Sequence, residues 1–357
     1  MRVPLVYHDG PIFGFDIGHK SIKLAQVTRH GKVIKVLGYG TCAFPPDTVI
    51  EGIIADPEII AAAVRPVLTK LAAGRISAHK VAAALPVSKV FVRTIQLPAM
   101  SSTDLDQAVK LEAEQYVPVP LADLYLDYQV IEQVAGGEGK EAQVNILMVA
   151  APRAIVDSYI QLFDLLSLEV DSLEVGLAAV TRVMLLGGGS DHGSLVVDFG
   201  SHSADMAVYD RVIRLTGTVA IGSDDLTTTL AAKLGITTDQ ANEIKFKFGI
   251  GPSGLQPKIV DALGLQLKAI TAEIKKVIKY YEDRNAKDKA ITQIILSGGG
   301  ASMPGLVEYF NTQLKLPIVI GDPWEHMSLG HLSLPPTLAA PVYTTTLGLA
   351  LREVEHD

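Results

Sequence analysis

Apolar and polar positions alternate with the period of a strand in Phe13–Val27, which reads FGFDIGHKSIKLAQV. An apolar run leads into Asp16 and a glycine, a polar turn follows, and a second alternating run leads back, which predicts a β-hairpin. The same pattern returns in Leu195–Tyr209, LVVDFGSHSADMAVY, where Asp198 takes the place of Asp16 when the two stretches are aligned without gaps. This internal repeat predicts two like-folded halves that present their Asp-x-Gly turns to each other.

The rest of the first half predicts an α/β unit that carries an insertion. After a third strand, Asp56 and the proline behind it mark the start of a helix, which is expected to run to about Ala73. A short buried strand follows this helix. Between about Pro86 and Ser167, the order strand, helix, strand, strand, helix predicts a compact inserted module.

The second half begins after a long connecting helix, which is predicted over Val170–Leu186 and ended by Gly187–Gly189. An apolar strand at Ile291–Leu296 runs into a glycine-rich turn, Ser297–Gly305, which opens another helix. Further helices are predicted at 226–233, 238–248, 258–285 and 343–352. This order completes a second α/β half with helical additions.

Composition narrows the class of protein. Of 357 residues, 48% are hydrophobic and 20% charged, so the chain can bury a large core. The net charge of −8, without a basic patch, argues against a nucleic-acid binder. The single cysteine excludes a disulfide framework. The lack of a signal core or of a run of about 20 apolar residues indicates a cytoplasmic protein without direct membrane insertion.

The chemistry suggested by the repeat is phosphate binding. Glycine lets a backbone N–H group approach an anion closely, and a carboxylate at the strand end suits hydrated Mg²⁺. Two such turns face to face would clamp a nucleotide and its metal ion. The third glycine-rich turn, Ser297–Gly305, opens a helix, where an anion or a flat ring can approach the backbone. P-loop and G-x-G-x-x-G motifs are absent.

Taken together, these stretches resemble the actin-like ATPase superfamily. Within it the chain is similar to the FtsA/PilM group, and most similar to the PilM family of type IV pilus assembly. The resemblance covers nearly the whole chain and is carried by FDIGHKSIKLAQV, LPAMSSTDLDQAVKLEAEQYVPVP with LDYQV, VVDFGSHSADMAVY, AIGSDDLTTTLAAKLGI, ILSGGGASMPGL and TTTLGLALRE. The implied fold is α/β, actin-like (ribonuclease H-like) and duplicated, with two lobes around a nucleotide cleft and a β-α-β-β-α insertion in the first lobe.

The resemblance also implies four subdomains. The first core subdomain comprises 1–85, 167–190 and 335–357, and the inserted subdomain comprises 86–166. The second core subdomain comprises 191–225 and 290–334, and the helical subdomain comprises 226–289. The C-terminal residues are therefore expected to return to the first lobe.

The cofactors implied by the resemblance are ATP and Mg²⁺. The implied cofactor-binding residues lie in two phosphate turns, on the strand after the first turn, on a helix near the ribose and base, and in an adenosine turn: Asp16, Gly18, His19, Lys20, Lys23, Gly200, Ser201, Ser203, Glu243, Lys245, Gly298, Gly299, Gly300 and Ala301. Asp16 and Asp198 would hold the metal through water. For Lys23, a solvated strand lysine is an equal alternative.

Glu174 is the candidate catalytic residue. It falls on the predicted connecting helix, where superfamily ATPases carry a residue that orients water toward the γ-phosphate, and a glutamate in a capping turn is the alternative. The chain also departs from the family pattern. His19 and Lys20 replace the small hydroxylic residues usual in the first turn, and Ser223 stands where a second glycine is common. These departures predict a slow Mg-dependent ATPase.

Three functions compete. The resemblance favours an ATP-binding scaffold of type IV pilus or related secretion machinery. Such a scaffold would dock the cytoplasmic N-terminal peptide of a PilN-like inner-membrane protein where the insertion meets the first half, and this partner would be its link to the membrane. An FtsA-like division anchor would need a basic amphipathic helix, and the chain ends in the acidic LGLALREVEHD. A sugar or acid kinase would need a base aimed at a hydroxyl, and none is evident. Self-association is a further expectation.

Overall fold

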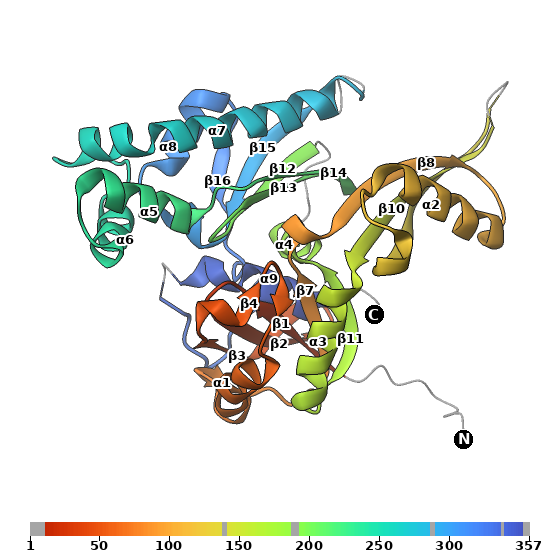
Figure 1. The fold of residues 1–357 in the computed structure, drawn as a ribbon, viewed down its shortest axis with the longest axis horizontal. Helices are drawn as coiled ribbons and strands as arrows, with labels where there is room; N and C mark the ends of the chain where they lie inside the picture. Colours follow the sequence, from red (N-terminus) through yellow and green to blue (C-terminus); the bar gives the residue numbers. More distant parts are fainter. Residues whose placement is uncertain (1–10, 138–140, 187–192, 286–289, 337–338, 353–357) are drawn as a thin grey trace.

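The computed structural model describes residues 11–137, 141–186, 193–285, 290–336 and 339–352. These residues form two lobes, each built on a β-sheet, and an inserted subdomain that lies beside both (Figure 1). The predicted helix end at Gly187–Gly189 lies outside the described residues.

The first lobe contains a seven-stranded sheet with the order β11-β7-β1-β2-β3-β17, in which β6 also pairs with β3. Phe13 and Phe15 on β1 are fully buried, which places this strand at the centre of the lobe. The strands of the sheet are β1 (Ile12–Ile17), β2 (Ser21–His30), β3 (Val33–Ala43), β6 (Ala73–Gly74), β7 (Lys80–Leu85), β11 (Glu169–Val175) and β17 (Met327–Ser328). A separate small hairpin consists of β4 (Val49–Ile50) and β5 (Ile53–Ile54).

Helices cover both faces of this first sheet. The face that carries Phe13 and Phe15 packs against α1 (Pro57–Thr69) and α3 (Arg153–Leu165). The opposite face packs against α4 (Gly176–Met184) and α9 (Thr344–Ala350). A Cβ atom on Gly14 would lie 2.0 Å from the carbonyl oxygen of Thr346, so glycine is needed for α9 to rest directly on β1.

The second lobe contains a five-stranded sheet with the order β14-β13-β12-β15-β16. Its strands are β12 (Gly193–Phe199), β13 (Ala204–Asp210), β14 (Val212–Val219), β15 (Ile291–Ser297) and β16 (Ile318–Ile320). Its main core lies under four helices, α5 (Ser223–Leu234), α6 (Thr238–Lys247), α7 (Gln256–Glu282) and α8 (Leu306–Leu314). The helix α4 joins the lobes, because its Val180 packs against Val196 and Ile295 of the second sheet.

The inserted subdomain is a three-stranded antiparallel sheet with one helix of its own. The strands β8 (Phe91–Pro98), β10 (Gln143–Pro152) and β9 (Leu124–Val134) lie in that order, and α2 (Ser102–Tyr116) packs on one face. Ser101 caps α2 by accepting a hydrogen bond from the backbone N–H of Asp104. With α3, these elements follow the order strand, helix, strand, strand, helix expected from the sequence.

Two predicted helices differ from the structure. Residues 169–175 form β11 and the helix begins only at Gly176, so the prediction of one helix over Val170–Leu186 is wrong. Parallel pairing of β11 with the buried strand β7 decides the conformation here, and Gly176, a poor helix former, stands at the point where the strand ends and the helix begins. The helix α1 ends at Thr69 rather than near Ala73, because Lys70 is extended and Ala73–Gly74 pairs with β3.

The chain returns to the first lobe earlier than the implied division placed it. Residues 290–334 were expected in the second core subdomain, but β17 at Met327–Ser328 pairs with β3. The ring of Trp324 also stacks edge-on with Tyr39 at a centroid distance of 5.1 Å and with Tyr343 at 5.6 Å. The return therefore begins before residue 335.

Candidate functional site

The two repeated hairpins have the same local geometry. In the first, the backbone N–H of Gly18 donates to the carbonyl oxygen of Ser21 at 3.0 Å, and in the second that of Gly200 donates to Ser203 at 2.9 Å. Each turn follows a strand that carries an aspartate two residues before the glycine. The repeat seen in the sequence is therefore a repeat of structure, with a tight glycine turn at the end of β1 and of β12.

The two turns touch across the space between the lobes. The rings of His19 and His202 meet edge-to-face at a centroid distance of 4.0 Å, and Lys20 Nζ lies 2.7 Å from Asp224 Oδ2. Burial lowers the pKa of His19, and the neighbouring His202 and Lys20 lower it further. The structure thus brings together the turns that the sequence predicted to face each other, and it adds Asp224 to the site.

The first hairpin neutralises its carboxylate within itself. Asp16 lies opposite Lys23 in the register of β1 and β2, and Lys23 Nζ is 3.5 Å from Asp16 Oδ2. Their side chains are only 14% and 15% exposed. Lys23 is therefore a largely buried partner of Asp16, and the alternative of a solvated strand lysine is wrong.

In the second hairpin, the position of Lys23 is taken by a carboxylate. Asp205 lies opposite Asp198 in the register of β12 and β13, and it is buried. Its carboxylate accepts hydrogen bonds from Ser203 Oγ at 2.9 Å and from Thr218 Oγ1 at 2.7 Å. Burial raises the pKa of Asp205, although these two hydrogen bonds oppose the change. The hydroxyl of Ser203 is thereby held against the sheet.

Asp198 has no cation beside it in its own hairpin. Burial raises the pKa of Asp198 to about 7, the charges of Asp205 and Asp16 add to this, and Lys23 opposes it. Two aspartates of the hairpins thus influence each other across the lobes. A divalent cation between them would remove the repulsion.

The third glycine-rich turn packs directly on this aspartate. Gly298 has φ of +80°, and a Cβ atom there would lie 2.6 Å from Asp198 Oδ1. A Cβ atom on Gly300 would lie 2.8 Å from the ring of Phe199. Gly299 and Ala301 continue the turn as a short 3₁₀ segment. Glycine is needed here because the backbone of one turn lies against the carboxylate of the other.

The start of the helix α5 packs against the second turn. A Cβ atom on Gly222 would lie 2.3 Å from the backbone of Ser201 and of His202. The backbone N–H of Ser223 donates to the carbonyl oxygen of Gly200 at 2.9 Å, and that of Asp224 donates to Ser201 at 2.8 Å. Ser201 itself is exposed at the tip of the turn. The start of α5 therefore fixes the turn in place.

The two candidate residues on α6 lie in different surroundings. Lys245 is buried, and its ammonium donates hydrogen bonds to Ser223 O at 2.8 Å, Ser223 Oγ at 2.7 Å and Thr227 Oγ1 at 2.6 Å. These use all three of its donors, and burial lowers its pKa to about 8. Lys245 thus fastens α6 to α5 behind the second turn. Glu243 is exposed on the same helix.

Glu174 is placed differently from the prediction. It lies on β11 rather than on a helix, and its carboxylate accepts from Arg182 Nη1 at 2.6 Å, Arg182 Nη2 at 2.9 Å and Arg352 Nη1 at 3.2 Å. Its side chain is 10% exposed. A carboxylate held by two arginines on a strand fits neither the predicted helix nor the alternative of a capping turn.

The sequence reading missed three residues that shape the site. Asp224 was not among the predicted site residues, although it forms the ion pair with Lys20 across the lobes. Asp205 and Gly222 were not singled out. Alignment of the hairpins would have found Asp205, because it occupies the position of Lys23 with the opposite charge. No sequence signal marked Gly222, whose role depends on how closely α5 approaches the turn.

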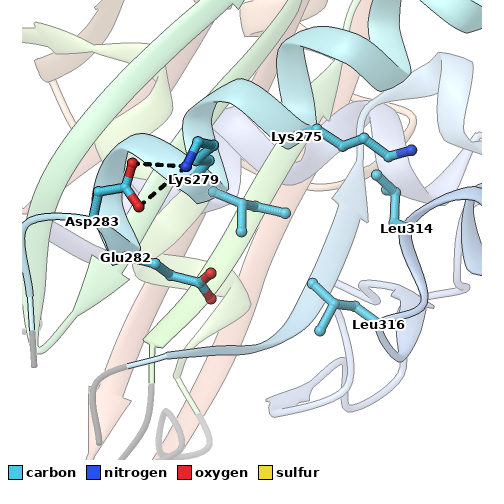
Figure 2. A pocket seen from close by; sticks show the side chains of 7 residues that line it. Lys275, Lys279, Glu282, Asp283, Leu314 and Leu316 are labelled. Carbon is cyan, nitrogen blue, oxygen red and sulfur yellow. Dashed lines mark hydrogen bonds and ion pairs between the residues drawn. The ribbon is translucent and has the colours of Figure 1, made fainter. Parts of the chain in front are cut away.

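A pocket lies apart from these turns, near the end of α7 and the end of α8 (Figure 2). Its polar groups are partly paired, since Lys279 Nζ is 3.0 Å from Asp283 Oδ2. The lining residues are Lys275, Ile278, Lys279, Glu282, Asp283, Leu314 and Leu316. None of the predicted site residues lines this pocket.

In the described part of the chain, no helix is long and apolar enough to cross a membrane.

Two sheets joined by α4, each with an antiparallel hairpin that ends in an aspartate and glycine turn, define the actin-like fold. Solved structures agree with this class. MreB5 of Spiroplasma citri bound to AMPPNP matches with a TM-score of 0.56 and 12% identity, over 98% of this chain and 98% of that chain. The predicted fold class is confirmed.

The chain belongs to the family described as Type IV pilus assembly protein PilM, which matches residues 14–354. A solved PilM–PilN type IV pilus biogenesis complex matches with a TM-score of 0.82 and 24% identity, over 96% of this chain and 98% of that chain. Cell division protein FtsA of Neisseria meningitidis is 22% identical over 278 residues, which are 70% of this chain and 66% of that FtsA. The predicted family is confirmed, and the chain spans about two thirds of the length of this FtsA.

Proposed function

We propose that the chain is an actin-like scaffold of type IV pilus assembly that binds Mg-ATP between its two hairpin turns. The observation that carries this proposal is the meeting of the turns, where His19 contacts His202 at the ends of two hairpins with the same internal hydrogen bond. Glycine turns at strand ends bind phosphates in many folds. The MreB5 relative was solved with AMPPNP, which adds support.

The residues present suit a hydrated metal ion. Asp16 and Asp198 provide one carboxylate from each hairpin, and the raised pKa of Asp198 indicates a place where positive charge is missing. Among the described residues, no group of three or more histidine, cysteine, aspartate or glutamate side chains converges on a point. Phosphate oxygens and water would therefore complete the coordination of Mg²⁺, as this ion prefers.

The glycine turns would take the rest of the nucleotide. Gly18 and Gly200 would lie against the phosphates, and Lys20 would exchange Asp224 for a phosphate oxygen. The turn that starts at Gly298 lies against Asp198, and we place the adenosine at this turn, as the resemblance to the actin-like ATPases implies. Glu243 would approach the ribose from α6. Lys245 would not contact the nucleotide but would hold α5 in place through its hydrogen bonds to Ser223.

Calorimetry with Mg-ATP tests this site. Asp198→Ala and Asp16→Ala should each weaken Mg-ATP binding by about tenfold or more, because each removes a charge-assisted contact worth roughly 1.5–3 kcal/mol. Asp261→Ala, an exposed carboxylate on α7, is the matched control and should bind as the wild type does. Unchanged affinity in both hairpin variants would show that the nucleotide does not bind here.

The scaffold role also needs a partner, and we propose the N-terminal cytoplasmic peptide of a PilN-like inner-membrane protein. Apolar side chains are exposed where the insertion meets the first lobe: Ile50 is 55%, Ile53 37% and Tyr125 41% exposed. They flank α3, since Ile54 N donates to Ser158 Oγ and Tyr125 Oη donates to Asp157. An extended peptide could cover these side chains. The PilM–PilN relative supports this choice of partner.

Titration of a labelled tail peptide onto the full chain tests the docking surface. Ile53→Asp and Tyr125→Ala should weaken binding by about tenfold, because truncation of a buried anchor typically costs more than about 1 kcal/mol. Val319→Asp, an exposed apolar position on β16, is the control. Full affinity in both junction variants would place the peptide elsewhere. Binding of the peptide to neither the wild type nor any variant would refute the partner itself.

A further inference from the structure

The inserted subdomain interrupts the first half of the chain, yet it also contacts the second lobe (Figure 1). While α2 covers one face of its sheet, Val92, Thr94 and Val149 point to the other face. Val92, Val149 and Ile213 of β14 all pack against the same apolar cluster, which contains core residues of the first lobe and Ala207 of the second. Thr94 Oγ1 donates to the carbonyl oxygen of Ile213 at 3.4 Å. The insertion therefore bridges the lobes.

An ion pair reinforces this bridge. Arg214 Nη1 on β14 lies 2.7 Å from Glu132 Oε2 on β9, and the same oxygen accepts from Asn145 Nδ2 at 2.9 Å. On the side of the second lobe, Arg214 Nε is 3.9 Å from Asp210 Oδ2. Arg214 is 16% exposed, so this pair is better shielded from solvent than a surface salt bridge. We name the contact between Arg214 and Glu132 the clasp.

The clasp lies on the same strand that supports the second turn. Thr218 of β14 donates to Asp205, and the same carboxylate accepts from Ser203 in the turn. Arg214 is on this strand, four residues earlier. A continuous set of hydrogen bonds and one strand thus connect the second turn with the insertion.

We propose that the clasp between Arg214 and Glu132 couples the insertion to the second lobe, so that the insertion follows the second lobe when the nucleotide cleft changes. This inference rests on the proposed function for its ligands. A nucleotide that moves the second turn also moves β14, and the clasp transmits this movement to the sheet that carries Tyr125. By linkage, the peptide must then alter nucleotide affinity by the same factor.

Distance measurements between spin labels test the clasp without relying on either ligand. Glu114→Cys on α2 and Lys268→Cys on α7 place labels at exposed positions of the insertion and the second lobe, in a chain whose native cysteine is replaced by Cys42→Ser. In the nucleotide-free chain we expect a narrow distance distribution. Arg214→Gln should broaden it. Glu132→Gln should do the same at less risk to folding, because Glu132 is 41% exposed.

Two further variants make the outcome specific. The charge-swapped pair, Glu132→Arg with Arg214→Glu, should restore a narrow distribution, whereas Lys276→Gln, which neutralises an exposed lysine on α7, should leave it unchanged. Equal distributions in the wild type, Arg214→Gln and Glu132→Gln would overturn the proposal. A distance distribution in the charge-swapped variant that is as broad as those of the single variants would also overturn the proposal.

Ligand titrations then measure the coupling itself. In the wild type, saturating Mg-ATP should change the affinity for the tail peptide by about fivefold or more, the usual lower range of allosteric coupling. In Glu132→Gln the change should fall below about twofold, while each ligand alone still binds. Equal coupling in the two proteins would overturn the proposal. Failure of Mg-ATP or peptide to bind the wild type would refute the proposed function instead, and the label distances would still decide the clasp.

Discussion

The two hairpins share a backbone geometry and differ in charge. At one cross-strand position, the first hairpin pairs Asp16 with Lys23, whereas the second pairs Asp198 with Asp205. The first therefore balances its buried carboxylate internally, and the second gathers two carboxylates in the same place. Duplication has preserved the fold of the turn while the electrostatics of the copies diverged. A site between them has one turn that is already neutralised and one that lacks a cation.

The largest expected effect comes from breaking the balanced hairpin. Lys23→Met removes the cation from a pair whose side chains are about 15% exposed and leaves Asp16 buried without its partner. Loss of one member of a buried ion pair costs about 3–5 kcal/mol, and we expect a decrease of that order in the free energy of unfolding, measured by urea denaturation. Lys20→Met removes an exposed ion pair as the control and should cost less than about 1 kcal/mol. Equal decreases in the free energy of unfolding would show that the pair of Asp16 and Lys23 stabilises the chain no more than the exposed pair of Lys20 and Asp224.

Neutralising Asp198 and neutralising Asp16 should have opposite effects on the stability of the chain in the absence of metal. Asp198 has a pKa of about 7 in the folded chain and 3.8 as a free side chain, so folding is opposed as pH rises from about 4 to 7. The full shift would correspond to about 4 kcal/mol, and partial exposure reduces this to about 2 kcal/mol. Asp198→Asn should therefore stabilise the chain at pH 8 and much less at pH 5.

Asp16→Asn is the matched comparison for Asp198→Asn. This change leaves Lys23 without the carboxylate that lies 3.5 Å from its ammonium, and it should destabilise the chain at pH 8. Urea denaturation at both pH values in a chelator distinguishes the two hairpins. If both variants move in the same direction at pH 8, the charge difference between the hairpins has no energetic consequence.

The smallest expected effect is that of Asp205→Asn on the pKa of Asp198, which tests how far one carboxylate of the second hairpin influences the other. The amide oxygen can still accept from one of the two hydroxyls, Ser203 or Thr218, and the amide N–H can donate to the other, so the turn should keep its shape. Removing this charge should lower the pKa of Asp198, because Asp205 is the largest charge that raises it. Titration of the Asp198 carboxyl carbon by NMR measures the change. An unchanged pKa would leave burial as the main cause.

The sequence predicted the parts of the fold that depend on local patterns. Alternation and glycine located both hairpins, and Asp56 was found as the residue that begins α1. Glu174 shows where this reasoning failed. Its segment has apolar residues that fit either a helix or a strand, and only the neighbouring strand β7 makes it β11. Long-range pairing of this kind leaves no mark in a single sequence.

For the candidate site, too, the sequence predicted the local turns but not the contacts between distant segments. The turns and Asp198 followed from the repeat, because like sequences fold alike. The contact between Lys20 and Asp224 joins residues 204 positions apart in sequence, and the buried state of Lys245 depends on how α6 packs on α5. Such contacts are set by the approach of two lobes. They become visible only when the lobes are assembled.

The helix α9 has a consequence for the order in which the chain is made. Gly14 on β1 packs against the backbone of Thr346, and the Thr346 hydroxyl donates to the carbonyl oxygen of Lys23 at 2.8 Å. During synthesis, β1 and β2 therefore wait for residues 344–350, while the insertion and the second lobe lie between them in the chain. Because domains fold as units during synthesis, the first lobe is completed only after the second lobe has been made, and until then one face of its central hairpin needs protection from premature association.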